Sequence, residues 1–315
     1  MKIAYLMTVH KDPLLLRRMI GTLSTADCAF FIHVDRKTSI REFSSIRGDN
    51  VFFSEWRIPV YRSEFSQVEA TLRLIEQALS FSPEYDYFVL LQGSTYPLRS
   101  GCYIHRFLET NRGWEFICLL KMPAPGYPLS KVNKVMYPCK KPVRRFAMRA
   151  FAKVGLAQRD YRKYLGALEA YAGKAYWALS REACKYIVEF VAHNPHVGQY
   201  FENSNTSDEM YFHTILGNSP FLPRIRRDLV YVDWSQSRGD HPAEINEGHL
   251  RFFESRENVW VEDEWGSGEM LFARKFSDDR LDLVDRIDDI IRRNEGGRGS
   301  SLAETGDVGS KARSG

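Results

Sequence analysis

Two short stretches of the chain combine ionisable side chains with neighbours that could hold them rigidly. In the first, residues 206–216, Asp208 and Glu209 precede an apolar stripe at helical spacing, and Ser207 is predicted to cap the helix. A carboxylate fixed at a packed helix start can act as a general base. Acidic first turns are also common simply because the helix dipole favours negative charge, so both interpretations stay open.

The second stretch, residues 272–276, reads Phe-Ala-Arg-Lys-Phe. Its two cations, Arg274 and Lys275, lie between phenylalanines that can anchor them in a core. Fixed cations stabilise negative charge that develops during a reaction. The alternative is an ordinary basic pair on a solvated face.

Composition limits the kind of protein that can carry these residues. The 315 residues are 44% hydrophobic and 27% charged, as in a soluble globular protein, and the formal net charge of +4 does not argue for nucleic acid. Five widely spaced cysteines without a CxxC pair predict a reducing compartment and no zinc site. No apolar run approaches the roughly 20 residues of a membrane span, so we expect a cytoplasmic protein.

The elements that position these residues follow a strand–helix–strand order. Ile3–Val9 is a nearly continuous apolar run, Pro13 suits the first turn of a following helix, and residues 29–34 form a second apolar run. This order predicts an α/β fold with a mostly parallel sheet flanked by helices. Ligands collect at the carboxyl ends of such strands, where His10 and Asp35 lie. Asp35 could bind a ribose or base, or only cap its loop.

Later segments add further strands, helices and aromatic candidates. Predicted strands cover residues 51–53, 87–91, 115–120 and 229–232, and predicted helices cover 63–79 and the stretch after Ser180. Tyr176 and Trp177 could stack on a sugar ring, although core packing explains them equally well. Leu281 opens a C-terminal helix. We expect one domain over residues 1–294 and a disordered tail over 295–315.

Residues 121–153 differ from the rest in charge. They contain nine Lys or Arg and no Asp or Glu, interleaved with prolines. The pattern predicts an extended loop followed by a basic helix, inserted in the domain. It is either a solvated loop or a contact for anionic lipid headgroups or a phosphate-bearing acceptor.

An α/β sheet of this kind with an acidic residue late in the chain suggests a nucleotide-sugar glycosyltransferase. Most metal-dependent members of that class hold a divalent cation with Asp-x-Asp, and this chain contains no Asp-x-Asp. Another positive group must then neutralise a departing diphosphate, and Arg274 and Lys275 are candidates.

Six motifs, taken in order, resemble one family. They are HVDRK at 33–37, YPL at 96–98, G-x-AYW-x-LS at 173–180, SDE at 207–209, DW at 233–234 with a following HP, and FARKF at 272–276. The set is similar to the core-2/I-branching β-1,6-N-acetylglucosaminyltransferases and their relatives, the peptide O-xylosyltransferases. The resemblance covers roughly residues 1–276, and SDE and FARKF are its most specific parts.

The resemblance implies a GT-A-like fold, inversion at the anomeric carbon and no metal requirement. It implies that Glu209 is the catalytic base, which removes a proton from the acceptor hydroxyl as that oxygen attacks the sugar carbon opposite UDP. Lys275 matches one of the basic residues that bind the donor diphosphate, with Arg274 or Arg251 as its partner. The nucleoside would lie against Val9, His10 and Asp35. Residues expected near the acceptor or sugar are Tyr176, Trp177, Asp208 and Trp234.

Two departures from the family pattern stand out. The family's Ser-Gly-x-Asp-Tyr-Pro turn reads Gln-Gly-Ser-Thr-Tyr-Pro here, so Thr95 stands in place of the Asp. The animal enzymes also carry a membrane anchor and disulfides, which we do not expect in this chain. The first departure affects donor or acceptor contacts that depend on that carboxylate. The second fits a bacterial relative that acts in the cytoplasm on a surface-polysaccharide precursor, with residues 121–153 docking on the inner membrane.

The sequence therefore predicts an inverting, metal-independent glycosyltransferase. It would move N-acetylglucosamine, or second xylose, from a UDP-sugar to a hydroxyl of a glycan or lipid-linked glycan. No cofactor and no nucleic-acid partner are expected. Two alternatives stay open: a catalytically silent nucleotide- or polysaccharide-binding protein, and a nucleic-acid-binding protein that uses the basic segment.

Overall fold

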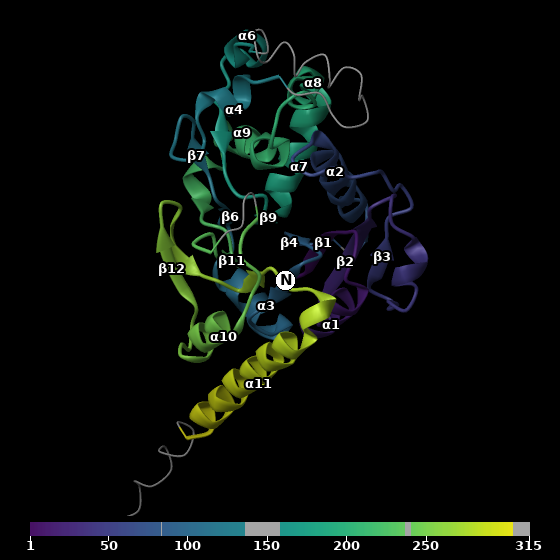
Figure 1. Ribbon diagram of the computed structural model, residues 1–315, viewed down its shortest axis with the longest axis vertical. Coiled ribbons are helices and arrows are strands. Elements are labelled where there is room, and N and C mark those ends of the chain that lie inside the picture. Colours follow the sequence, from purple (N-terminus) through teal and green to yellow (C-terminus); the bar gives the residue numbers. More distant parts are fainter. Residues whose placement is uncertain (83, 136–157, 237–240, 305–315) are drawn as a thin grey trace, which may run out of the picture.

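The computed structural model of the protein describes residues 1–82, 84–135, 158–236 and 241–304, the last nine of these by their backbone alone. A central sheet has helices on both sides, and one long helix, α11 (Leu281–Glu304), extends away from the body (Figure 1).

Within the described residues the largest sheet has seven strands. In spatial order they are β10 (Ile225–Arg226), β6 (Glu115–Ile117), β9 (Trp177–Ser180), β4 (Tyr87–Gln92), β1 (Ile3–Val9), β2 (Cys28–Val34) and β3 (Val51–Phe53). Neighbouring strands are parallel except where β9 pairs with β4 and β6. The predicted mostly parallel α/β sheet is confirmed, because the continuous apolar runs β1, β2 and β4 lie at its centre and are buried on both faces.

Each face of the sheet has its own core, since alternate side chains of a strand point in opposite directions. Ile3 and Tyr5 of β1 belong to one core, and Ala4 and Leu6 belong to the other. The helices of the first core are α1 (Pro13–Leu23), α3 (Gly101–Thr110), α10 (Glu247–Glu254) and α11. The helices of the second are α2 (Phe65–Leu79), α4 (Leu129–Asn133), α6 (Tyr161–Leu165), α7 (Arg181–His193), α8 (Pro195–Phe201) and α9 (Tyr211–Gly217).

Smaller elements complete the described chain. The antiparallel pairs are β7 (Leu120–Lys121) with β8 (Tyr171–Ala172), and β12 (Trp260–Asp263) with β13 (Gly266–Glu269). A three-stranded sheet contains β11 (Val230–Val232), β14 (Phe272–Arg274) and β5 (Thr95–Pro97). The 3-10 turns are η1 (Ile40–Phe43), η2 (Ser207–Glu209), η3 (Leu222–Arg224) and η4 (Asp278–Arg280).

The three-stranded sheet brings the late part of the chain to the end of β4. Strand β5 follows β4 after two residues and pairs with β14, so that Arg274 lies opposite Thr95. The amide of Phe276 donates to the carbonyl of Ser94 at 2.9 Å. The FARKF motif is therefore fixed beside the carboxyl end of a central strand.

Three sequence predictions about local secondary structure are wrong. Residues 207–209 form a 3-10 turn rather than a helix start, and α9 begins at Tyr211. The Ser207 hydroxyl does not cap, because it donates to the carbonyls of Phe201 and Ser204 at 2.7 and 3.0 Å. Residues 92–98, predicted as a turn, contain the strand β5.

Helix α11 also differs from the prediction of a disordered tail from residue 295. It continues to Glu304, because a helix that is already nucleated and packed can propagate through glycines that each cost only about 1 kcal/mol. Residues 305–315 lie outside the described residues.

The basic segment is described in part. The basic helix predicted within residues 121–153 falls on residues 136–157, outside the described ones. The described start is folded against the body: Lys121 pairs with Glu169 at 3.3 Å, and Val132 of α4 is fully buried. In the part of the chain that the structure describes, no helix is both long and apolar enough to span a membrane.

Candidate active site

The acidic pair lies on the turn η2, between α8 and α9. Asp208 and Glu209 are both partly buried. Asp208 Oδ2 accepts a hydrogen bond from Gln67 Nε2 at 3.0 Å, while its Oδ1 is buried and has no hydrogen-bond partner among the described residues. Burial and the adjacent charge of Glu209 raise the pKa of Asp208.

Glu209 faces the loop that follows β7. The Tyr127 hydroxyl and the charges of Lys131 and Arg62 act on its carboxylate. These three groups lower the pKa of Glu209, but burial outweighs them and leaves it raised. A carboxylate with a raised pKa is a stronger proton acceptor than an exposed one, as a general base requires.

The backbone of the acidic turn is also fixed. The carbonyl of Glu209 accepts a hydrogen bond from the amide of Gly173 at 2.9 Å. A Cβ at Gly173 would lie 1.8 Å from the carbonyl oxygen of Cys118, so only glycine fits this close approach. The first residue of the G-x-AYW-x-LS motif therefore serves to place the acidic turn.

The basic pair ends β14. Arg274 is 6% exposed and donates from Nη1 to Gln92 Oε1 at 2.7 Å and from Nη2 to Ser94 Oγ at 2.9 Å. Its guanidinium carbon lies 4.8 Å from the ring centroid of Tyr176. Burial, then the charge of Arg62, lowers the pKa of Arg274, yet a guanidinium stays charged at physiological pH. Arg274 is thus a fixed buried cation.

Lys275, the next residue, is partly exposed. Its Nζ lies 3.1 Å from His241 Nδ1. Burial, followed by the charges of Arg274 and Arg62, lowers the pKa of Lys275 to about 8. A lysine whose ammonium is crowded by other cations gains interaction energy when an anion arrives, so this position suits an anionic ligand.

Arg62 links the two pairs, and sequence reasoning missed it. Its charge lowers the pKa of Asp208 and Glu209 on one side and of Arg274 and Lys275 on the other. Arg62 lies in the irregular segment before α2 and belongs to no motif or periodic pattern. Only the folding of three distant segments onto one another reveals its place.

A small pocket connects the end of the main sheet with the acidic turn. Thr8 and Gln92, register partners on β1 and β4, line it together with Asp208. Its other lining residues are Val60, Gln67, Thr71, Leu90, Ala175, Trp177 and Phe212. Because Gln92 also accepts a hydrogen bond from Arg274, one side chain connects the basic pair to the pocket that contains Asp208.

The predicted nucleoside-binding residues lie together at the ends of β1 and β2. The Asp35 amide donates to the carbonyl of Val9 at 2.8 Å, and exposed His10 follows Val9. Asp35 caps its loop, as its Oδ1 accepts from the Lys37 amide at 2.9 Å and its Oδ2 pairs with Lys37 Nζ at 3.2 Å. A carboxylate has further lone pairs, so capping leaves room for a ligand and the nucleoside role stays a prediction.

The aromatic candidates occupy three environments. Trp177 is 3% exposed and packs against Phe212 with ring centroids 6.1 Å apart, which agrees with the alternative of core packing. Tyr176 is partly buried beneath Arg274. Trp234 is 52% exposed on the segment that follows β11, so its ring is open to a ligand.

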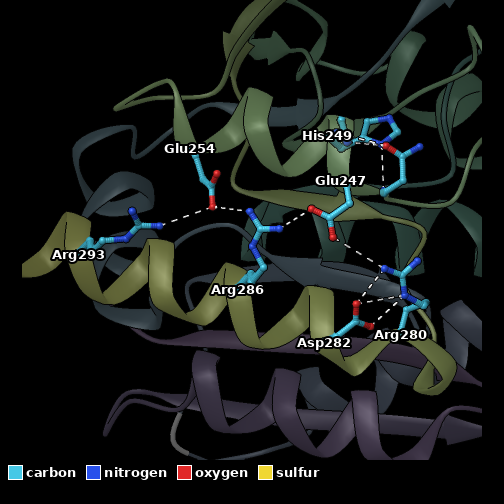
Figure 2. Close-up of polar contacts among 9 residues, drawn as sticks. Glu247, His249, Glu254, Arg280, Asp282, Arg286 and Arg293 are labelled. Atoms are coloured by element: carbon cyan, nitrogen blue, oxygen red, sulfur yellow. Dashed lines mark hydrogen bonds and ion pairs between the residues drawn. The ribbon is translucent and has the colours of Figure 1, made fainter.

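Arg251 lies on another element than the other basic candidates. It is exposed on α10, which Arg286 of α11 holds by pairing with Glu247 and, at 2.9 Å, with Glu254 (Figure 2). Arg251 therefore stays a candidate partner of Lys275, and Arg62 joins it because the charge of Arg62 acts on Lys275.

Comparison with known proteins identifies the family. The family model described as "Branch: Core-2/I-Branching enzyme" matches residues 3–255. The chain belongs to the Core-2/I-branching enzyme family. The described residues of this family member contain no group of three or more His, Cys, Asp or Glu side chains placed to hold a metal ion.

Curated relatives of this Core-2/I-branching enzyme differ in the sugar that their names give. Beta-glucuronosyltransferase GlcAT14A of Arabidopsis thaliana is 26% identical over 89% of this chain and 62% of its own length. A xylosyltransferase of Ciona intestinalis is 21% identical over 76% of this chain and 28% of its own. A beta-1,3-galactosyl-O-glycosyl-glycoprotein beta-1,6-N-acetylglucosaminyltransferase 4 of Mus musculus is 23% identical over 59% and 40%. The chain therefore spans less than two thirds of the length of each.

Thr95, the departure from the family turn, lies directly opposite Arg274 and is fully buried. Its hydroxyl oxygen is buried without a hydrogen-bond partner in the described part of the chain. Gln92 and Ser94 are the residues that accept hydrogen bonds from Arg274. Neutral acceptors leave the full positive charge of Arg274 uncompensated, which favours an anion nearby.

Proposed function

We propose that this chain is an inverting, metal-independent glycosyltransferase that uses a UDP-sugar. The observation that carries the proposal is the arrangement of Glu209, a partly buried carboxylate with a raised pKa, and the cations Arg274 and Lys275, with Arg62 acting on both. Direct displacement of a nucleoside diphosphate needs a base on one side of the reacting carbon and an anion-binding group on the other.

Glu209 takes the proton of the acceptor hydroxyl in the proposed reaction. The acceptor oxygen then forms a bond to the anomeric carbon while the bond from that carbon to the diphosphate oxygen breaks, which inverts the configuration. Asp208 keeps its own proton more readily than an ordinary aspartate because burial raises its pKa, so it adds less negative charge beside the base than an ordinary aspartate would.

The cations receive the charge of the leaving group. Negative charge develops on the β-phosphate as its bond to the sugar breaks, and Lys275 with Arg274 and Arg62 stabilises it. Arg274 needs no rearrangement to do so, because Gln92 and Ser94 already hold its guanidinium. Val9, His10 and Asp35 are the proposed nucleoside contacts, and Trp234 is a proposed contact of the acceptor or sugar.

The donor, acceptor and cellular setting extend the proposal. UDP-N-acetylglucosamine is the favoured donor and UDP-xylose the second, and the names of the relatives add UDP-glucuronic acid to the set worth testing. The proposed acceptor is a glycan or lipid-linked glycan hydroxyl in bacterial surface-polysaccharide synthesis. A GT-A-like fold, a cytoplasmic location and a peripheral contact of residues 121–153 with the inner membrane belong to the same proposal.

The experiment is UDP-sugar hydrolysis and transfer with the three donors in the presence of EDTA. We expect one donor to be turned over at a rate that EDTA does not change. Activity that EDTA abolishes and Mn²⁺ or Mg²⁺ restores would contradict metal independence. A chain that binds UDP without turnover would support the silent-binder alternative, and salt-sensitive polyanion binding without UDP affinity would support the nucleic-acid alternative.

A further inference from the structure

Tyr127 lies in the described start of the basic segment and reaches the acidic turn. A reverse turn holds its backbone, since Ala124 and Tyr127 exchange amide-to-carbonyl hydrogen bonds of 3.1 and 2.9 Å. Its hydroxyl donates to the carbonyl oxygen of Gly173 at 3.3 Å, and the amide of Gly173 donates to the carbonyl of Glu209 at 2.9 Å. The same hydroxyl acts on the Glu209 carboxylate and lowers its pKa, so Tyr127 lies beside the proposed base.

The ring of Tyr127 is held from two sides. Trp265, between β12 and β13, packs against it edge to face with ring centroids 5.7 Å apart. The Nζ of Lys131 lies 4.4 Å from the Tyr127 ring centroid. The Trp265 ring has its own cationic neighbour in Lys174, whose Nζ lies 5.8 Å from its centroid and 3.9 Å from Asp263 of the same hairpin. A ring fixed in this way gives its hydroxyl a defined position.

We propose that Tyr127 is a positioning residue, whose hydroxyl holds the Glu209 carboxylate toward the acceptor while Trp265 and Lys131 hold the Tyr127 ring. The inference rests on the proposed function, in which Glu209 is the base. A phenol has one proton to donate. It donates to Glu209 while that carboxylate is charged, and the carbonyl of Gly173 offers a second acceptor once Glu209 has taken the acceptor's proton.

The charged and titratable groups that face Glu209 come from four elements. Asp208 is its neighbour on η2, Arg62 precedes α2, Tyr127 follows β7 and Lys131 belongs to α4. Tyr127, Lys131 and Arg62 each lower the pKa of Glu209, so removal of the Tyr127 hydroxyl should raise that pKa further. A base with a higher pKa is protonated, and inactive, up to a higher pH.

The test is Tyr127→Phe, which removes the hydroxyl and keeps the ring. We expect the acid limb of the kcat/KM profile to move up by about one pH unit, the size of one hydrogen bond to a charged group, with roughly tenfold lower transfer below that limb. UDP affinity should stay as in the wild type. Tyr164→Phe is the matched control, because Tyr164 is 57% exposed on α6 and should leave the profile unchanged.

A second pair of variants tests the support of the ring. Trp265→Ala should shift the acid limb in the same direction, whereas Trp260→Ala, a 58% exposed tryptophan of the same hairpin, should not. An acid limb that stays in place in Tyr127→Phe, whether or not the rate falls, would overturn the inference, because a purely structural role changes the rate without moving the limb. That outcome is distinct from a failure of the proposed function, in which the wild-type chain itself turns over no UDP-sugar.

Discussion

The acidic turn η2 and the end of β14 each present two adjacent ionisable residues, and the two regions share a pattern. In each pair one member is anchored by a glutamine amide: Gln67 donates to Asp208, and Gln92 accepts from Arg274. Among the described residues no glutamine amide anchors the second members, Glu209 and Lys275. We infer that the anchored residues set the position of each pair and that Glu209 and Lys275 carry out the chemistry.

The two regions differ in the elements that hold their ionisable residues. Arg274 is held by residues of a sheet, which fix it whether or not a ligand is bound. Glu209 depends on a 3-10 turn and on a loop that brings Tyr127. The cation site is therefore built into the fold, whereas the base is placed by segments that are easier to perturb.

The largest effect should come from the base itself. Glu209→Gln keeps the shape and removes the proton acceptor, so we expect transfer to fall by about 10³-fold. UDP affinity should be retained, as measured by calorimetry. Asp208→Asn, one residue away, should retain far more activity. Equal losses in the two variants would contradict the division of roles within the acidic pair.

Next in size is the loss of the cation. Lys275→Gln should lower kcat by about 10²-fold, because an interaction made with the developing charge of the leaving group is removed. We expect Arg251→Gln to change kcat by less than twofold, because Arg251 is exposed on α10 whereas the charge of Arg62 acts on Lys275. Steady-state kinetics with both variants tests Arg251 as the partner of Lys275, because a large loss in Arg251→Gln would support Arg251 over Arg62.

The pH profile gives a smaller but more specific effect. A lysine loses its charge as pH rises through its pKa, and the pKa of Lys275 is lowered to about 8. We therefore expect kcat/KM to fall about fivefold between pH 8 and 9. The kcat/KM of Lys275→Arg should stay constant over this pH range, since arginine stays charged. An alkaline limb that is identical in the two proteins would assign it to another group.

The smallest expected effect concerns stability. The pKa of Asp208 is raised above 3.8 in the folded state, so the folded protein binds more protons than the unfolded chain between pH 3.8 and the raised value, and stability falls as pH rises through that window. Asp208→Asn removes this term. The Tm difference between variant and wild type should grow in favour of the variant by a few degrees from pH 4 to pH 8. Asp49→Asn, at an exposed site, should show no such trend.

Much of the fold could be predicted from the sequence, because local patterns determine it. The continuous apolar runs of β1, β2 and β4 predict buried parallel strands, and the structure confirms them. Pro13 opens α1 as predicted, and the helix predicted after Ser180 is α7, which the Ser180 hydroxyl caps by accepting from the amide of Ala183 at 3.2 Å. Failures occur where tertiary contacts override local pattern, as when Ser207 donates to carbonyls of α8 and the following turn instead of capping.

The site could be predicted only where a motif exists. Asp208, Glu209, Arg274 and Lys275 lie in family motifs, so each could be named from the sequence. Arg62 and Tyr127 lie in irregular segments without periodicity, and their proximity to Glu209 arises from long-range folding. No spacing rule connects residues that are brought together by separate loops.

UDP binding in the presence of EDTA tests the central claim most directly, namely that fixed cations bind the diphosphate while Glu209 serves only the proton transfer. Calorimetric titration of UDP into wild type, Glu209→Gln and Lys275→Gln separates the two roles. We predict equal affinity for wild type and Glu209→Gln and at least tenfold weaker binding for Lys275→Gln. Wild-type affinity in Lys275→Gln, or binding that appears only when Mn²⁺ replaces EDTA, would contradict the claim.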